Sequence, residues 1–260
     1  MASVLLFLLP ILALLVAPSI ADENNLLLTG ETLSTDGQLS QLDSTFVMQD
    51  DCNLVLYSSN GARFQSNTRG KGINCTLTLN NFGQLIIRSA DGYTVWTSTP
   101  AYNSVSGKYA AVLQSDGVVV IYGPSVWSTP EFHFTASGGP VSEFESQSIS
   151  RARNALFSDQ TLFGSHVLAT RDYTLVMRDD CNLALVKASV GDIWSSNTKG
   201  LGSHCFAQLD HQGRLVVQDH HSGAVWGSTP PTKEGDFVLI LQINGQAVVY
   251  GPAIWSTVSF

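Results

Sequence analysis

The feature that most constrains the fold is an internal duplication that runs along nearly the whole chain. The segment Asp50–Leu54 recurs as Asp179–Leu183, 129 residues later, and Tyr122–Thr129 recurs with two substitutions as Tyr250–Thr257, 128 residues later. So constant an offset indicates two homologous domains in tandem. We place the first domain at residues 22–130 and the second at residues 152–260.

The N-terminal segment predicts the cellular compartment. Val4–Val16 is an apolar run of signal-peptide length, too short to span a bilayer, and the small residues Ser19 and Ala21 follow it. We therefore predict a signal peptide over residues 1–21, cleavage after Ala21, and a secreted or vacuolar protein that does not insert into the membrane.

A second segment without a counterpart in the repeat lies between the two domains. Residues 131–151 are dense in Ser, Gly, Pro and Glu, which is typical of a linker. Ser150–Arg153, beside this acidic and Ser-rich stretch, leads to the hypothesis that the linker is cleaved during processing.

A shorter period inside each domain predicts its architecture. One aromatic residue precedes a Ser/Thr-rich turn about every 30 residues, at Phe64, Trp96 and Trp127 and again at Trp194, Trp226 and Trp255. Short β-branched segments separated by Asp-Gly and Asn-Gly pairs indicate hairpins. We predict an all-β protein in which each domain has three antiparallel sheets around a pseudo-threefold axis. The aromatic residues are expected to fill that axis, and exposed stacking platforms are the alternative.

The four cysteines occupy equivalent places in the two repeats. Cys52 and Cys75 are 23 residues apart, and Cys181 and Cys205 are 24 apart. In a chain destined for export this spacing favours one disulfide in each domain, Cys52–Cys75 and Cys181–Cys205. A zinc site made by all four thiolates is the competing interpretation, but the C-x2-C pairs typical of such sites are absent.

Several function classes are disfavoured by the composition. The net charge of −8, without a basic stripe, argues against nucleic-acid binding. His220 and His221 would face opposite sides of a strand, so we expect no metal site and no cofactor. The serines that follow each aromatic residue (Ser66, Ser98 and Ser128) lack a Gly-x-Ser-x-Gly context, so we expect no enzyme. The sequon at Asn74 contains a cysteine and precedes a strand, which disfavours its glycosylation.

The segment Gln49–Tyr57 carries the most specific chemistry in the chain. Its alternate residues are Gln49, Asp51, Asn53, Val55 and Tyr57, and a strand would place all five on one face. This row offers a carboxylate, two amides, a phenol and an apolar patch. Such groups suit the hydroxyls and the C–H face of a sugar ring, whereas a single carboxylate suits acid–base catalysis poorly.

With these residues the chain resembles the monocot mannose-binding lectins, whose signature is Gln-x-Asp-x-Asn-x-Val-x-Tyr. The resemblance covers nearly all of residues 24–130 and, more loosely, residues 152–260. It implies two tandem β-prism II domains, each with three four-stranded sheets. It also implies that Asp51 and Asn53 bind the axial 2-hydroxyl of mannose, that Tyr57 binds the 4-hydroxyl and Val55 the ring carbons, and that Gln49 adds a hydrogen bond.

The other five copies of the motif depart from this pattern. The third copy of the first domain keeps Gln114, Asp116, Val120 and Tyr122 but has Val118 for Asn, so we expect weakened mannose binding. The third copy of the second domain keeps Gln242, Val248 and Tyr250 with Asn244 for Asp, and it is a candidate for an altered site. The remaining copies are more eroded: Asn80-x-Phe82-x-Gln84-x-Ile86-x-Arg88, Arg178-x-Asp180-x-Asn182-x-Ala184-x-Val186 and Asp210-x-Gln212-x-Arg214-x-Val216-x-Gln218.

These observations predict a lectin for mannose-containing glycans and glycoproteins, with a role in defence or storage. The resemblance further implies that the two halves stay associated, partly by exchanging C-terminal strands, and form a homodimer or a heterotetramer of processed halves. Multivalency would then compensate for weak single sites. The alternative is a storage or protein-interaction scaffold whose sugar sites have mostly decayed.

Overall fold

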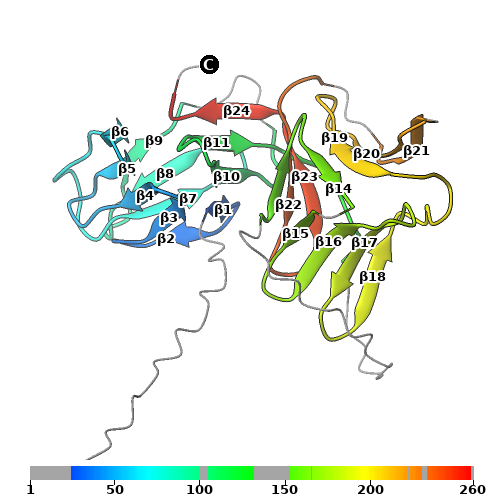
Figure 1. Ribbon diagram of the computed structural model, residues 1–260. Helices are drawn as coiled ribbons and strands as arrows, with labels where there is room; N and C mark the ends of the chain where they lie inside the picture. The colour runs from blue at the N-terminus through cyan, green and yellow to red at the C-terminus, as the bar shows by residue number, and fades with distance from the viewer. Residues whose placement is uncertain are drawn as a thin grey trace, which may run out of the picture.

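The computed structural model describes residues 25–99, 105–131, 153–164, 166–221, 223–229 and 233–258. The predicted signal peptide lies outside these residues, as does the predicted linker apart from Glu131. Every regular element in the described part of the chain is a β-strand (Figure 1). No helix there is long and apolar enough to cross a membrane.

The first domain consists of three four-stranded antiparallel sheets. The first sheet has the order β3 (Gln38–Gln41), β4 (Ser44–Met48), β5 (Leu54–Ser58), β6 (Gly61–Gln65). The second has the order β2 (Thr32–Leu33), β7 (Thr76–Leu79), β8 (Leu85–Arg88), β9 (Thr94–Thr97). The third has the order β1 (Leu26–Leu28), β10 (Ala110–Leu113), β11 (Val119–Tyr122), β24 (Ala253–Ser256).

The second domain repeats this arrangement. Its first sheet has the order β15 (Val167–Ala169), β16 (Tyr173–Met177), β17 (Leu183–Lys187), β18 (Gly191–Ser195). Its second has the order β14 (Thr161–Phe163), β19 (Phe206–Leu209), β20 (Leu215–Asp219), β21 (Gly223–Gly227). Its third has the order β13 (Ala155–Phe157), β22 (Val238–Leu241), β23 (Ala247–Tyr250), β12 (Ser125–Ser128). The predicted class, tandem prisms of three four-stranded sheets, is confirmed.

The two domains exchange their last strands, as the resemblance implies. In Figure 1, β24 lies along β11 of the first domain. In the same way, β12 of the first half pairs with β23 of the second domain. A threonine fixes each exchanged strand to its host sheet. Thr257 Oγ1 accepts the N–H of Val119 at 3.1 Å, and Thr129 Oγ1 accepts the N–H of Ala247 at 3.1 Å. Each prism is therefore closed by the chain of the other.

The aromatic residues line the two prism axes, but in combinations that their sequence spacing did not predict. Trp127 packs edge-on against Trp194 and Trp226, with ring centroids 5.9 and 6.1 Å away. Phe64 packs in the same way against Trp96 and Trp255, at 6.2 and 5.9 Å. The interpretation as core residues is correct. The grouping of Trp127 with the first domain and Trp255 with the second is wrong, because the exchanged strands carry these indoles across.

Both predicted disulfides are present and join the first sheet of each domain to the second. Cys52–Cys75 has a Cα–Cα distance of 5.2 Å, and Cys181–Cys205 has one of 5.1 Å. Three of the four cysteines have no exposed surface, and Cys205 is nearly buried. The bridges therefore close the cores, each under the turn that leads into the motif strand.

The third sheets of the two domains pack against each other through their outer faces. The buried residues of this interface are Ala110, Val112, Val120, Tyr122, Ala155, Val238, Ile240, Val248 and Tyr250. A buried hydrogen bond from Asn154 Nδ2 to Asn25 Oδ1, at 3.3 Å, adds to it. Consequently, the motif copies on the two third sheets lie between the domains, while the copies on the other sheets face outward.

Candidate functional site

The complete motif lies on a hairpin whose turn separates its first residues from its last. The turn joins β4 to β5: Cys52 N–H donates to Gln49 O, and Gln49 N–H donates to Asn53 O, both at 3.0 Å. Cys52 has a left-handed backbone with φ of 68°. The expectation of one straight strand is therefore wrong for Gln49 and Asp51, which precede β5. They join the other motif residues because the chain reverses direction there.

The hairpin still brings the motif side chains together on the outer face of the first sheet. Gln49 Nε2 donates a hydrogen bond to the Tyr57 hydroxyl at 3.0 Å. Val55 pairs with Val47 across the hairpin and is almost completely buried, so it forms the apolar floor between them. Tyr57 is 38% exposed. The phenol thus stands open to solvent with its orientation fixed by the glutamine.

The buried Asn53 has a structural task that the sequence did not reveal. Its Oδ1 accepts the N–H of Thr68 and the hydroxyl of Ser66, both at 3.2 Å. Its Nδ2 donates to Gln65 Oε1 at 3.3 Å. Because the carbonyl is used to hold the 66–68 loop, the amide N–H group is what this residue can offer to a ligand.

Asp51 is held by two contacts beside the turn. Its Oδ1 accepts the N–H of Asn53 at 2.9 Å, and its Oδ2 pairs with Arg69 Nε at 3.0 Å. The side chain of Arg69 is 83% exposed, so this ion pair is strongly screened by solvent. Gln65 and Arg69 are the neighbours that motif reasoning missed. For Gln65 the signal was present, because Phe64 points into the core and its strand neighbour must point out.

The corresponding hairpin of the second domain keeps the scaffold and has lost the open polar face. Asn182 Oδ1 accepts the N–H of Thr198 at 3.2 Å and the hydroxyl of Ser196 at 3.4 Å, as Asn53 does in its own loop. Arg178, which stands where Gln49 does, forms a double hydrogen bond with Asp192 at 2.5 and 2.6 Å. Asp192 pairs in register with Val186, the residue in place of Tyr57. An ion pair therefore occupies the place of the glutamine–tyrosine pair, and it raises the pKa of Arg178 further.

The second copies of both domains direct their polar groups into their own turns. Asn80 Oδ1 accepts the N–H groups of Phe82 and Gln84, both at 2.9 Å. Asp210 accepts the N–H groups of Gln212 and Arg214 at 3.0 and 2.8 Å, and also Arg214 Nε. In these copies the side-chain oxygens hold their own turns, so they do not form a row of polar groups for a sugar.

The third copies keep the glutamine–tyrosine pair but bury it. Gln114 Nε2 donates to the Tyr122 hydroxyl and Gln242 Nε2 to the Tyr250 hydroxyl, both at 2.6 Å. Tyr122 is 3% exposed and Tyr250 2%, against 38% for Tyr57. Burial raises the pKa of Tyr250 to about 12, and burial together with the charge of Asp236 raises that of Tyr122 strongly. Both phenols stay protonated in the interface between the domains.

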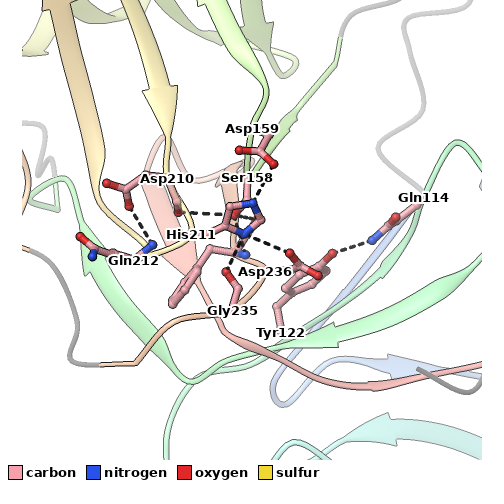
Figure 2. Close-up of polar contacts among 10 residues, drawn as sticks. Gln114, Tyr122, Ser158, Asp159, Asp210, His211, Gln212, Gly235 and Asp236 are labelled. Carbon is pink, nitrogen blue, oxygen red and sulfur yellow. Dashed lines mark hydrogen bonds and ion pairs between the residues drawn. The ribbon is translucent and has the colours of Figure 1, made fainter.

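One histidine, His211, lies with two aspartates beside the third motif copy of the first domain (Figure 2). His211 Nε2 lies 2.7 Å from Asp159 Oδ2, and Nδ1 lies 3.2 Å from Asp236 Oδ1. The hydrogen bond with Asp159, helped by the carbonyl of Gly235, raises the pKa of His211. Among the described residues, no group of three or more His, Cys, Asp or Glu side chains is arranged to hold a metal ion.

The tandem prisms with an open hairpin of carboxylate, amide and phenol groups define the class as two-domain lectins. No family model matches the chain. Mannose-specific lectin 2 of Crocus vernus is 55% identical over 253 residues, covering 96% of this chain and 94% of that protein. Mannose-specific lectin 2 of Colocasia esculenta is 47% identical over 261 residues, covering 100% and 95%. The chain belongs to the monocot mannose-binding lectin family.

A solved structure of similar organisation supports the arrangement of both domains. The fetuin-binding agglutinin of Scilla campanulata, described as a two-domain lectin, matches with a TM-score of 0.77 at 33% identity. The match covers 90% of this chain and 100% of that one.

Proposed function

We propose that this protein is a mannose-binding lectin whose principal site is the hairpin Gln49–Tyr57. The observation that carries the proposal is that this copy alone combines all five motif residues with an exposed tyrosine. Relatives named mannose-specific lectins, at 55% and 47% identity, support the sugar class. They also disfavour the alternative of a scaffold with decayed sites, and they are lectins, not enzymes.

The contacts of the hairpin suggest how the sugar is held. Asp51 accepts and the Asn53 amide donates, so together they can satisfy both needs of one axial 2-hydroxyl. Tyr57, oriented by Gln49, is placed to meet the 4-hydroxyl, and Val55 supplies the apolar floor. An equatorial 2-hydroxyl, as in glucose, would leave the buried Asn53 amide without its hydroxyl partner.

We propose that the third motif copy of each domain is a lesser sugar site than the Gln49–Tyr57 hairpin. The site of Gln114, Asp116, Val120 and Tyr122 remains the weakened one, since it lacks the amide and its tyrosine is covered by Phe157 at a ring distance of 6.2 Å. The site of Gln242, Asn244, Val248 and Tyr250 remains the altered one. Useful affinity therefore depends on several chains presenting one open site each.

The proposal extends to assembly and location. Export through the secretory pathway agrees with the two disulfides, which persist in oxidising compartments. Cleavage of the linker would leave halves that share sheets, and these would pair into a homodimer or a heterotetramer. A role in defence or storage completes the proposal.

Calorimetric titration of the mature protein with methyl α-mannoside and methyl α-glucoside tests the function. We expect one equivalent of mannoside per chain and much weaker binding of the glucoside. Failure of the folded protein to bind either the mannoside or mannan-agarose would overturn the proposal. Two bands near half the mature mass on a denaturing gel of the native protein would support processing, and one full-length band would contradict it.

A further inference from the structure

A cavity of about 360 Å³ lies where the exchanged strand β12 meets the second domain. Its wall is composite. The first domain contributes Lys108 and the serines Ser125 and Ser128, and the second contributes Gln242 and Tyr250. The volume lies at the small end of ligand pockets, which suits a saccharide of one or two units.

The polar groups in this cavity are those of a saccharide site, but their arrangement differs from that of the Gln49–Tyr57 hairpin. Tyr250 lines the cavity, is 2% exposed and accepts a hydrogen bond from Gln242. The Oε1 of Gln242 and the phenolic proton can still bond to a ligand. Ser125 and Ser128 on β12 are less buried than Tyr250, so a ligand would be seated toward the exchanged strand.

The charge of this site is opposite to that of its counterpart in the first domain. Lys108 and Asp236 are equivalent by position, since Ser125 N–H donates to Lys108 O at 2.7 Å and Ala253 N–H donates to Asp236 O at 2.8 Å. The Gln114–Tyr122 copy thus has Asp236 beside it (Figure 2). It also keeps the motif aspartate, Asp116.

The Gln242–Tyr250 copy, in contrast, has the neutral Asn244 in place of the motif aspartate, and Lys108 in its wall. No carboxylate occurs among the described residues that line the cavity. Burial and, to a smaller extent, the charge of Glu31 raise the pKa of Tyr250. Glu31 Oε2 accepts the Leu28 N–H at 2.7 Å, and Glu31 is not part of the lining. The motif anion is lost, and Lys108 stands where the other copy has Asp236, so this site favours a ligand of negative charge.

We propose that this interdomain cavity binds a saccharide unit that carries a carboxylate, with Lys108 as its ionic partner and the β12 serines as hydroxyl partners. The site is separate from Gln49–Tyr57 and takes a different class of sugar. The protein then binds a neutral and an acidic saccharide at two sites on one chain.

The test uses NMR titration of the full-length mature protein with two matched pairs of ligands. Methyl glucuronide is compared with methyl glucoside, and sialyllactose with lactose. We expect the wild type to bind each acid at least about fivefold more tightly than its neutral partner, with a preference that decreases as salt is added. Lys108→Gln should reduce that preference to near unity while leaving methyl mannoside binding unchanged.

Lys199→Gln is the matched control, because it removes one exposed lysine of the second domain that does not line the cavity. It should retain the preference for acids. An equal affinity of the wild type for acid and neutral ligands would overturn the proposal, as would an unchanged preference in Lys108→Gln. Equal binding of glucose 6-sulfate would contradict the assignment to carboxylates. Loss of mannoside binding alone would count against the proposed function and not against this site.

Discussion

The first hairpins of the two domains, Gln49–Tyr57 and Arg178–Val186, share the hydrogen bonds of their turns but differ in the side chains on their outer surfaces. In both, the asparagine carbonyl accepts a threonine N–H at 3.2 Å, and the preceding aspartate accepts the asparagine N–H, at 2.9 and 3.1 Å. On the outside, a glutamine and an exposed tyrosine in one domain are replaced by an arginine–aspartate pair in the other.

This difference separates two roles that the motif combines. The aspartate and asparagine occur in both copies, where they hold the turn and the following loop. Of these two hairpins, only the first, whose surface is open, has the glutamine, valine and tyrosine. The persistence of Asp180 and Asn182 in the degenerate copy is therefore weak evidence for sugar binding there, because both residues also hold the turn and the loop.

The largest expected effect tests this separation at the aspartates. Asp51→Ala should weaken mannoside binding about 10- to 100-fold, since a hydrogen bond donated to a charged group contributes about 1.5–3 kcal/mol. Asp180→Ala, the matched control, should leave mannoside affinity unchanged. Calorimetry gives the affinities, and the melting temperature of each variant shows whether it is folded. Equal effects at both positions would refute the assignment of the site to the first domain.

Restoring the polar outer side chains of the Arg178–Val186 hairpin should create a second mannose site, because its turn keeps the same hydrogen bonds. We expect the combined variant Arg178→Gln, Ala184→Val, Val186→Tyr and Asp192→Ala to bind a second equivalent of methyl mannoside per chain. The asparagine and aspartate are already in place, so only the outer face needs rebuilding. Titration stoichiometry is the measurement, with Val186→Tyr alone as the control. An unchanged stoichiometry in the folded variant would show that the frames differ more than their hydrogen bonds suggest.

Removing the shared asparagine should affect stability in both domains and binding in only one. Asn53→Ala and Asn182→Ala each leave a buried threonine N–H without its acceptor, which costs about 1–3 kcal/mol of unfolding free energy. Denaturant unfolding measures this cost. Mannoside affinity should fall in Asn53→Ala and remain in Asn182→Ala. If stability were unchanged in both, the asparagine would not have the structural role described.

The smallest effect concerns pH and a contact that the two domains make differently. Asn81 Nδ2 bonds to Ser106 in the first domain, whereas His211 pairs with Asp159 and Asp236 in the second. The folded-state pKa of His211 is raised above its ordinary 6.5. Its stabilisation is therefore complete below about pH 6.5 and is lost as pH rises through the raised value.

Consequently, the melting temperature of the wild type should exceed that of His211→Asn more at about pH 5.5 than at about pH 8.5. Asn81→Asp alters the equivalent contact of the first domain with a carboxyl group whose ordinary pKa, about 3.9, lies below this range. The difference in melting temperature between wild type and Asn81→Asp should therefore be the same at both pH values. A pH-independent gap between wild type and His211→Asn would rule out the ion pairs as its source.

Much of the fold was predictable because it depends on local patterns repeated six times. The turn pairs, the β-branched segments and the equivalent cysteine spacing determine hairpins, sheets and both disulfides. The partners of Trp127 and Trp255 were not predictable from spacing. Homologous domains have interchangeable last strands, so the same period fits either prism, and only the three-dimensional path selects one.

The candidate site was predictable in composition and less so in geometry. Alternation placed Val55 and Tyr57 correctly on one face, but the left-handed Cys52 turns the chain before Asn53. The burial of Tyr122 and Tyr250 depends on contact between two sheets distant in sequence. The sequence of one motif copy contains no information about that contact.

The exchange of β12 and β24 means that the halves of this protein are not independent modules. To separate them, Trp127 and Trp255 would each have to leave a core formed mainly by the other half. The peptide bond between the halves is then not what keeps them together, and a cut in the linker would change the number of chains without releasing either one. Dissociation would require partial unfolding, so a nicked molecule should persist as long as an intact one.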